Sequence, residues 1–310
     1  MSGDEANGGN SSGSNANGSN ARGGLAGSDG WRARLFIAFQ HLLPQHGLSR
    51  LVLGATRVRS RWFKNALIRG FLRLFRVDMS DAVEPDPLRY GSFNEFFTRA
   101  LKDGARPIAR ATDAIACPVD GCVSEAGSID GGRLLQAKNR CFELTELLAE
   151  QPWASYFEGG SFATIYLAPF NYHRIHMPLR GVLEETVYVP GRLFSVNALT
   201  ARHVPNLFAR NERVLTLFDT DYGRFALVLV GALNVGSMAT VWAGDITPAA
   251  RRVVSRIPGP PTTLEKGAEL GRFNMGSTVI LLFEPKRARW NPNVRAGSVV
   301  RLGESLGSLA

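Results

Sequence analysis

The residues best suited to chemistry are a serine, two histidines and an aspartate that lie far apart in the chain. Ser277 follows Gly276, and an apolar run that reads as a buried strand begins directly after it at Thr278. Glycine leaves the preceding carbonyl unhindered, so a serine here could attack its own preceding peptide bond, form an ester and split the chain. Gly-Ser-Thr is also a common turn, so this interpretation depends on the other sites.

Two of the five histidines, His173 and His176, lie between Pro169 and Pro178. They follow a predicted strand, and we expect both on a loop that this strand fixes, a position that catalytic groups favour. A His-x-x-His pair could bind a metal, but no cysteine, glutamate or third histidine lies at matching spacing, so we predict no metal site. The alternative for each histidine is a structural hydrogen bond.

Asp120 lies between Pro118 and Gly121, where an ordinary Asp-Gly turn is the alternative to a functional role. Asp120, a histidine and Ser277 nevertheless supply the orienting acid, the base and the nucleophile of a catalytic triad. Such triads assemble in space rather than along the sequence.

The elements that must position these residues are mainly strands after Pro107. Short apolar and β-branched runs predict strands over 162–167, 182–189, 213–218, 224–230, 237–242 and 278–284, and a short helix over 144–150. Residues 219–223 predict a hairpin connection. Ser92 and Glu95 predict a capping box on a short helix that buries three phenylalanines. Neither βαβ alternation nor a glycine-rich phosphate loop is present, which disfavours a nucleotide fold.

The head of the chain differs sharply in composition. Residues 1–30 are almost entirely Gly, Ser, Asn and Ala and predict a flexible tail. Residues 31–77 hold ten Lys and Arg and no Asp or Glu, with apolar residues at helical spacing and Pro44 and Gly47 expected to separate two helices. Basic amphipathic helices suit an anionic membrane surface. The alternative is that the apolar stripes pack on the protein's own core. No nucleic-acid-binding motif accompanies the charge.

These patterns predict an α+β fold, with basic amphipathic N-terminal helices on a predominantly antiparallel, sandwich-like β core. We expect a membrane-associating helical region over 31–106 and a β-rich catalytic core over 107–310. The net charge of +9 favours an anionic partner. Three cysteines without a CxxC motif disfavour a disulfide framework, and we expect them to be structural. No apolar run is as long as a membrane span.

Seven short motifs occur in order along the chain. They are Phe93-Asn-Glu-Phe-Phe-Thr-Arg99, Pro118-Val-Asp-Gly121, Tyr172-His-Arg-Ile-His-Met-Pro178, Gly191-Arg-Leu-Phe-Ser-Val-Asn197, Asn211-Glu-Arg213, Lys266-Gly-Ala-Glu-Leu-Gly271 and Gly276-Ser-Thr278. Taken together, they resemble the phosphatidylserine decarboxylase family, the pyruvoyl-dependent type of bacterial membranes and mitochondria. The resemblance runs from about Trp31 to Glu284. The family usually has leucine where this chain has Met275, an apolar exchange that should not disturb processing.

The resemblance implies a proenzyme that cleaves itself between Gly276 and Ser277. Asp120, His176 and Ser277 match the family's self-cleavage triad: His176 would take the proton of Ser277, and Asp120 would hold the imidazole in its useful tautomer. The products would be a β chain of residues 1–276 and an α chain of residues 277–310.

The resemblance also implies the cofactor and the reaction. Ser277 would become a covalent pyruvoyl group, form a Schiff base with the serine amine of phosphatidylserine, and accept electrons as the lipid loses CO2 and becomes phosphatidylethanolamine. His173 matches the histidine assigned to decarboxylation, either as a proton donor or as an orienter of the carboxylate. No external cofactor would be needed.

A peripheral position on the cytoplasmic side of a bacterial cell membrane and a homodimer are implied by the resemblance as well. A mitochondrial origin is disfavoured because the head has a single arginine before Arg32 and three acidic residues. Three alternatives stay open: a serine hydrolase acting on lipid esters, although the chain lacks Gly-x-Ser-x-Gly; a lipid-binding relative without catalysis; and a decarboxylase for another amine-bearing lipid or a soluble amino acid.

Overall fold

The chain is described by a computed structural model that covers Ala38, Gln40 and residues 43–137, 140–232, 237–247, 253–274 and 278–310. The expected cleavage site, Gly276 and Ser277, lies outside the described residues, as does the tail over 1–30.

The described strands form four sheets in which every strand pair is antiparallel. The largest has nine strands in the order β12-β7-β8-β9-β15-β5-β2-β17, and β13 also pairs with β7. Its strands are β2 (Gly121–Ser128), β5 (Ser161–Tyr166), β7 (Gly181–Val189), β8 (Arg213–Asp219), β9 (Phe225–Val230), β12 (Ser255–Arg256), β13 (Thr263–Leu264), β15 (Thr278–Phe283) and β17 (Val299–Val300).

A second sheet has four strands in the order β11-β10-β14-β6, and two smaller sheets complete the set. The four strands are β6 (Arg174–His176), β10 (Met238–Thr240), β11 (Gly244–Asp245) and β14 (Glu269–Phe273). The smaller sheets are β1-β18-β16, with β1 (Ala114–Ala116), β16 (Ala288–Trp290) and β18 (Ser305–Leu309), and the pair β3 (Arg133–Ala137) and β4 (Arg140–Glu143).

The centre of the large sheet is apolar because its strands are buried along their whole length. Every residue of β9 and β15 is buried, which explains why their sequences are continuous apolar runs rather than alternating patterns. Ile175, Met238, Leu270 and Phe273 of the four-stranded sheet belong to the same hydrophobic cluster. The two sheets therefore share one core, and the predicted α+β fold with a predominantly antiparallel core is confirmed.

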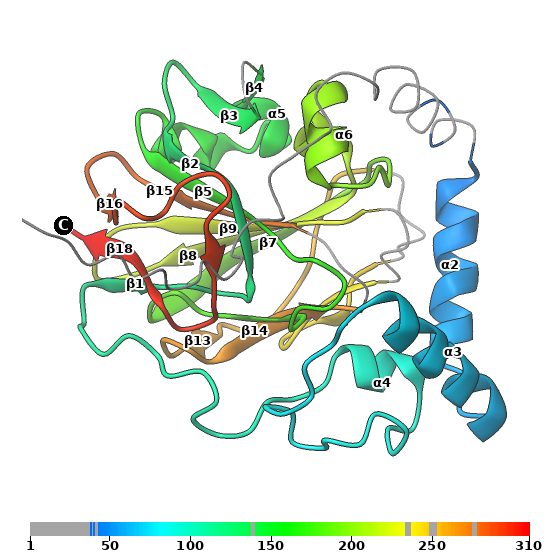
Figure 1. Cartoon of the computed structure of the whole chain (residues 1–310). Coiled ribbons are helices and arrows are strands. Elements are labelled where there is room, and N and C mark those ends of the chain that lie inside the picture. Colours follow the sequence, from blue (N-terminus) through cyan, green and yellow to red (C-terminus); the bar gives the residue numbers. More distant parts are fainter. Residues whose placement is uncertain are drawn as a thin grey trace, which may run out of the picture.

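The helices lie mainly at the edges of the sheets. Figure 1 shows α2 and α3 along one edge of the molecule, with α4 beside them. Ser92 caps α4 as predicted, since its hydroxyl accepts a hydrogen bond from the Glu95 amide at 3.1 Å. The helices are α2 (Gln45–Thr56), α3 (Arg61–Leu74), α4 (Phe93–Phe97), α5 (Leu144–Leu147), α6 (Ala198–His203), α7 (Leu207–Arg210) and the 3-10 helix η1 (Pro152–Phe157).

The N-terminal helices bury one side and expose the other. The expected boundary at Pro44 is confirmed, because Pro44 is the N-cap of α2. Gly47 lies inside α2, so the expectation is wrong for it, and a second boundary after Thr56 separates α2 from α3. Ile68 of α3 packs with the phenylalanines of α4, as the core-packing alternative predicts. Trp62 and Leu74 are 76% and 79% exposed. None of the described helices is long and apolar enough to cross a membrane.

The three cysteines are free thiols. Cys117 is buried, Cys122 is half-buried and Cys141 is exposed, and their structural role stays a prediction.

Candidate active site

The strands on either side of residues 275–277 bring distant segments of the chain together. β14 ends at Phe273 beside β6, and β15 begins at Thr278 between β5 and β9. Residues 275–277 therefore link the four-stranded sheet to the nine-stranded sheet. Thr278 pairs with Tyr166, and Tyr166 pairs with Cys122 on the strand that follows Asp120.

His176 ends β6 and lies close to the Asp120 segment. Its backbone amide donates to the carbonyl of Pro118 at 2.9 Å. The expectation that both histidines lie on a loop is thus wrong for His176, which is on a strand, whereas His173 lies in the connection between β5 and β6.

The ring of His176 is held at both nitrogens. Nδ1 lies 2.7 Å from the carbonyl oxygen of Gly267, and Nε2 lies 3.0 Å from the hydroxyl of Tyr172. Because a carbonyl only accepts hydrogen bonds, Nδ1 carries the proton and Nε2 accepts from Tyr172. Burial lowers the pKa of His176, and the hydrogen bond to Gly267 opposes that shift. The ring is therefore neutral at pH 7 with its basic site at Nε2, the form that a general base requires.

Gly267 can present its carbonyl to His176 because it is a glycine. Its φ is +81°, in the left-handed region, and a Cβ would lie 2.8 Å from Cγ1 of Ile108. Its own amide donates to the carbonyl of Met177 at 2.9 Å. The turn before β14 is thereby tied to the residue that follows His176.

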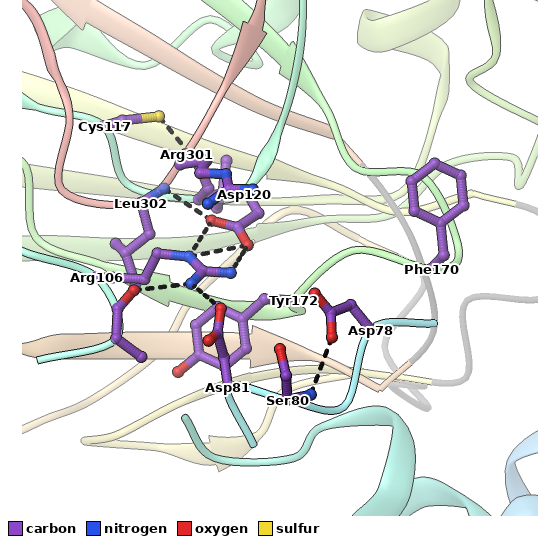
Figure 2. A network of polar contacts seen from close by, with 12 residues as sticks. Asp78, Ser80, Asp81, Arg106, Cys117, Asp120, Phe170, Tyr172, Arg301 and Leu302 are labelled. Carbon is purple, nitrogen blue, oxygen red and sulfur yellow. Dashed lines mark hydrogen bonds and ion pairs between the residues drawn. The ribbon is translucent and has the colours of Figure 1, made fainter. Parts of the chain in front are cut away.

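Asp120 is 7% exposed, and its carboxylate accepts hydrogen bonds from residues other than His176. Figure 2 shows Arg106 between Asp120 and Asp81. Arg106 donates to the Asp120 carboxylate through Nη2 at 2.7 Å and through Nε at 3.0 Å, and the amide of Leu302 donates to it at 2.8 Å. Among the contacts of the described residues, no hydrogen bond joins Asp120 to His176. The orienting hydrogen bond expected from Asp120 is made by the Gly267 carbonyl instead.

His173 is completely buried and stacks on Phe97, with ring centroids 4.1 Å apart and planes inclined by 17°. Nε2 lies 3.3 Å from the carbonyl of Pro169, so Nε2 carries the proton. Nδ1 is buried and has no hydrogen-bond partner among the described residues. Burial lowers the pKa of His173 to about 3, so the ring is neutral at pH 7. Its carbonyl accepts from the amide of Phe273 at 3.0 Å, shortly before the expected cleavage site.

Two buried polar atoms of the described residues, one before β6 and one at the start of β15, are free to bind a further polar group. Oγ1 of Thr278 is buried without a hydrogen-bond partner among the described residues, as is Nδ1 of His173. Buried polar atoms are normally paired, so the Thr278 hydroxyl suits a carbonyl acceptor, whereas the unprotonated Nδ1 of His173 suits a hydrogen-bond donor. Within the same described part of the chain, no group of three His, Cys, Asp or Glu side chains could hold a metal ion.

Comparison with known proteins identifies the family. The sequence model described as "Phosphatidylserine decarboxylase" matches residues 93–308, and one described as "PSD" matches residues 35–76. This chain belongs to the phosphatidylserine decarboxylase family. The resemblance inferred from the seven motifs is confirmed.

Similar family members are named "Phosphatidylserine decarboxylase proenzyme". The protein of Methylococcus capsulatus (strain Bath) is 54% identical over 278 residues, which are 89% of this chain and 96% of that protein. The protein of Bordetella bronchiseptica is 55% identical over 283 residues, covering 89% and 95% of the two chains. The protein of Pseudomonas putida (strain GB-1) is 54% identical over 280 residues, covering 89% and 98%. The predicted enzyme class agrees with these names.

Three residues contribute to the site in ways that the sequence does not reveal. Tyr172 opens the histidine motif, but nothing in the sequence shows that its hydroxyl bonds His176. Arg106 is one of many arginines, and only the fold brings it to Asp120. Gly267 acts through its backbone, and the motif Lys266-Gly267 predicts a turn without showing where its carbonyl points.

Proposed function

We propose that this chain converts phosphatidylserine to phosphatidylethanolamine and CO2, with a pyruvoyl group that it makes from its own Ser277. The observation that carries the proposal is the match to the decarboxylase family across most of the folded chain. Asp120, His173 and His176 lie on segments that meet at the strand ends flanking residues 275–277, which supports the assignment of the site.

Self-cleavage needs a base for the Ser277 hydroxyl, and Nε2 of His176 is the available lone pair. Nε2 takes the proton of Ser277 by one of two routes. Either the Tyr172 hydroxyl turns away and the transfer is direct, or the hydroxyl passes its own proton to Nε2 and receives the proton of Ser277. Burial raises the pKa of Tyr172, so the hydroxyl keeps its own proton at neutral pH. Ser277 then attacks the Gly276 carbonyl, and the Nδ1–H bond to Gly267 stabilises the imidazolium that forms. The peptide bond becomes an ester, and the freed amine of residue 277 takes the proton back from His176. β-Elimination then releases the carboxylate of Gly276 and leaves dehydroalanine, and hydrolysis of its imine tautomer by water releases ammonia and leaves the pyruvoyl group.

Asp120 acts in this scheme through its charge and its position. Its carboxylate is fixed by Arg106 and by the amide of Leu302. Asp120 belongs to the expected β chain and Leu302 to the expected α chain, so this hydrogen bond also joins the two products. β15 is hydrogen-bonded along six residues to both β5 and β9, which retains the α chain after cleavage.

In decarboxylation the pyruvoyl group supplies an electron-withdrawing carbonyl that stabilises the negative charge left at the substrate's α-carbon. His173 has an unprotonated Nδ1, so it accepts a proton or a hydrogen bond in this state. We assign it to taking a proton from the substrate's amino group and returning it to the α-carbon after CO2 leaves. Phe97 covers one face of the ring and keeps water away from it.

The first test is an intact-mass spectrum of the denatured protein, with and without borohydride. We expect two chains divided between Gly276 and Ser277, and a mass increase of the smaller chain after reduction of its terminal carbonyl. The variant Ser277→Ala should stay a single chain and release no CO2 from phosphatidylserine. An active wild-type protein with one unmodified chain, or a Ser277→Ala variant that retains decarboxylation, contradicts the proposal. Lipid-ester cleavage by an intact chain would favour the hydrolase alternative.

Attachment to an anionic membrane surface is part of the same proposal. Leu51, Trp62 and Leu74 on α2 and α3 are 70%, 76% and 79% exposed, and exposed arginines lie between them. Large exposed apolar side chains among cations suit insertion at the lipid interface. The homodimer remains an expectation from the family resemblance, which light scattering on the processed protein would test.

Sedimentation with vesicles tests the attachment. Trp62→Glu should reduce binding to phosphatidylglycerol-containing vesicles by about tenfold, because it removes an apolar anchor and adds a repelled charge. Val253→Glu is the matched control, since Val253 is 68% exposed and lies outside these helices. Equal losses for the two variants, or none for Trp62→Glu, would contradict docking through α3.

A further inference from the structure

Two arginines are buried without an ion pair among the described residues, and they differ in how their donors are used. Arg213 is 3% exposed, and burial lowers its pKa to about 10. Four of its five N–H donors are nevertheless used, because it donates to four carbonyl oxygens at 2.5–3.0 Å. Arg213 is therefore a structural arginine. The carbonyls belong to Glu146, Leu147, Ala209 and Asn211.

Arg99 is 5% exposed, but most of its donors have no partner among the residues that the structure describes. Its hydrogen bond is a long one, from Nη2 to the carbonyl of Phe170 at 3.3 Å, and its Nε is buried without a partner among the described residues. Burial lowers the pKa of Arg99, yet a guanidinium keeps its charge at neutral pH. A buried cation without an anion is costly, so a group with this geometry is suited to receive an anionic ligand.

Arg99 lines a cavity of about 190 Å³ that also borders the active site. Asp120 and Tyr172 are part of its wall, and Figure 2 shows them together with Arg301 and Phe170. Through Tyr172 the cavity adjoins His176, and Arg99 lies close enough to His173 for its charge to help lower the pKa of that ring. A ligand held at Arg99 would thus lie beside both histidines.

The charges around this cavity leave an excess of cations. Arg106 pairs with both Asp81 and Asp120. The wall holds four arginines against three aspartates, a net charge of +1. The arginines are Arg76, Arg99, Arg106 and Arg301, and the aspartates are Asp78, Asp81 and Asp120. The cavity therefore carries net positive charge around a guanidinium that has free donors, which is the chemistry that binds a phosphate or a carboxylate.

We propose that the cavity at Arg99 binds the phosphodiester of the phospholipid head group, an inference that rests on the proposed function. Substrate and product both contain this phosphate, whereas the carboxylate is lost as CO2. An arginine on the carboxylate would stabilise the group that has to leave and would oppose the reaction. Binding the phosphate instead holds the head group in place through the whole reaction and stabilises the ground state and the transition state equally.

Binding by the uncleaved variant Ser277→Ala tests the site without any pyruvoyl chemistry. We expect calorimetry to detect both glycerophosphoethanolamine and glycerophosphoserine, and Arg99→Gln to weaken both by the same factor of about ten or more. Serine, which has no phosphate, should be insensitive to the substitution. A loss confined to glycerophosphoserine would assign Arg99 to the carboxylate and overturn the proposal. Binding of inorganic phosphate but of neither ester, or of none of these compounds, would overturn it as well.

Exposed Arg301 provides a second variant for the case in which Arg99→Gln does not fold. Arg301→Gln should weaken both esters about threefold, because it removes one cation from the rim. Arg289→Gln is the control: it makes the same charge change at an exposed position on β16, away from the cavity. Equal affinities in Arg301→Gln and Arg289→Gln would count against the cavity.

Kinetics of the processed enzyme separate this inference from the proposed function. Arg99→Lys should raise the KM for short-chain phosphatidylserine about tenfold with kcat nearly unchanged, since the phosphate contact is equal in ground and transition states. A fall in kcat at constant KM would mean that Arg99 acts on the chemistry, and the phosphate assignment would be wrong. Failure of the wild-type chain to release CO2 would defeat the proposed function, whereas the binding measurements stand independently of it.

Discussion

Replacing Gly267 with alanine should slow self-cleavage while leaving the chain folded. The residue has φ +81°, and a Cβ there would lie 2.8 Å from Cγ1 of Ile108. The left-handed backbone costs an alanine about 1–2 kcal/mol, and the contact must also be relieved by a shift. The shift moves the carbonyl that holds Nδ1 of His176 at 2.7 Å. A hydrogen bond of this kind contributes about 1 kcal/mol, so we expect cleavage to slow by about fivefold or more.

Gly297→Ala is the matched control for the backbone cost. Its φ is +88°, and nothing lies within 4 Å of the position that a Cβ would take. It should therefore lose similar stability in thermal unfolding and keep the wild-type cleavage rate. The assay is the appearance of the two chains over time on a denaturing gel, after expression under conditions that delay processing.

A double variant identifies the cause of the effect. Ile108→Ala in the Gly267→Ala background removes the contacting side chain, so the turn can relax and the cleavage rate should recover in part. If Gly267→Ala and Gly297→Ala cleave at the same rate, the Gly267 carbonyl does not position His176 and the reasoning is refuted. A slow Gly267→Ala variant that Ile108→Ala does not rescue would attribute the effect to the backbone conformation alone.

Three further predictions concern the titration and burial of the site. Burial lowers the pKa of His176 below its ordinary 6.5, so the cleavage rate should stay constant as the pH falls to 6.5 and decline only in more acidic buffer. A pH series in which the cleavage rate reaches half of its maximum above pH 6.5 would contradict this. The pKa of His173 is about 3 in the folded chain and near 6.5 in the unfolded chain. The free energy of unfolding should therefore fall as the pH drops from 6.5 towards 3. Urea titrations of His173→Phe should show a weaker fall. Asp120→Asn should lower the free energy of unfolding in urea by about 3 kcal/mol, because it leaves Arg106 partly unpaired. The control Arg180→Gln breaks an exposed ion pair with Glu265 and should lower it by less than about 1 kcal/mol. Equal losses in the two variants would show that the Asp120 pair is not specially stabilising.

The sequence predicts the centre of the fold better than the strands that hold the site. The strands β8, β9 and β15 are apolar along most of their length, and β5 and β7 combine apolar and β-branched residues with a few polar ones, so composition is enough to find them. β2, β6 and β14 are missed because they are short or carry Gly, Arg and Glu in place of a regular pattern. They are strands because a neighbour supplies their hydrogen bonds, and a single sequence does not contain that information.

The same limit applies to the site. The types and spacing of residues point to Asp120, His173 and His176, and the fold brings their segments together at the ends of β2, β5 and β6. The hydrogen-bond partners of each side chain, in contrast, are not predicted by the sequence. Arg106 and Leu302 reach Asp120 only through tertiary structure, and Leu302 does so by a backbone amide that has no sequence signature.

The hydrogen bonds of the two histidines give them opposite tautomers, and this separates their roles. His176 has its proton on Nδ1, fixed by the Gly267 carbonyl, and its basic Nε2 meets a hydroxyl. His173 has its proton on Nε2, fixed by the Pro169 carbonyl, and its basic Nδ1 has no partner among the described residues. A base for a hydroxyl nucleophile has to be oriented by a hydrogen bond on its other nitrogen, and His176 has the shorter and therefore stronger one, at 2.7 Å against 3.3 Å. A residue that exchanges protons with a substrate needs an unoccupied lone pair instead, and His173 has one. The residues thus suit self-cleavage and decarboxylation respectively, and the difference arises from which backbone carbonyl each ring faces.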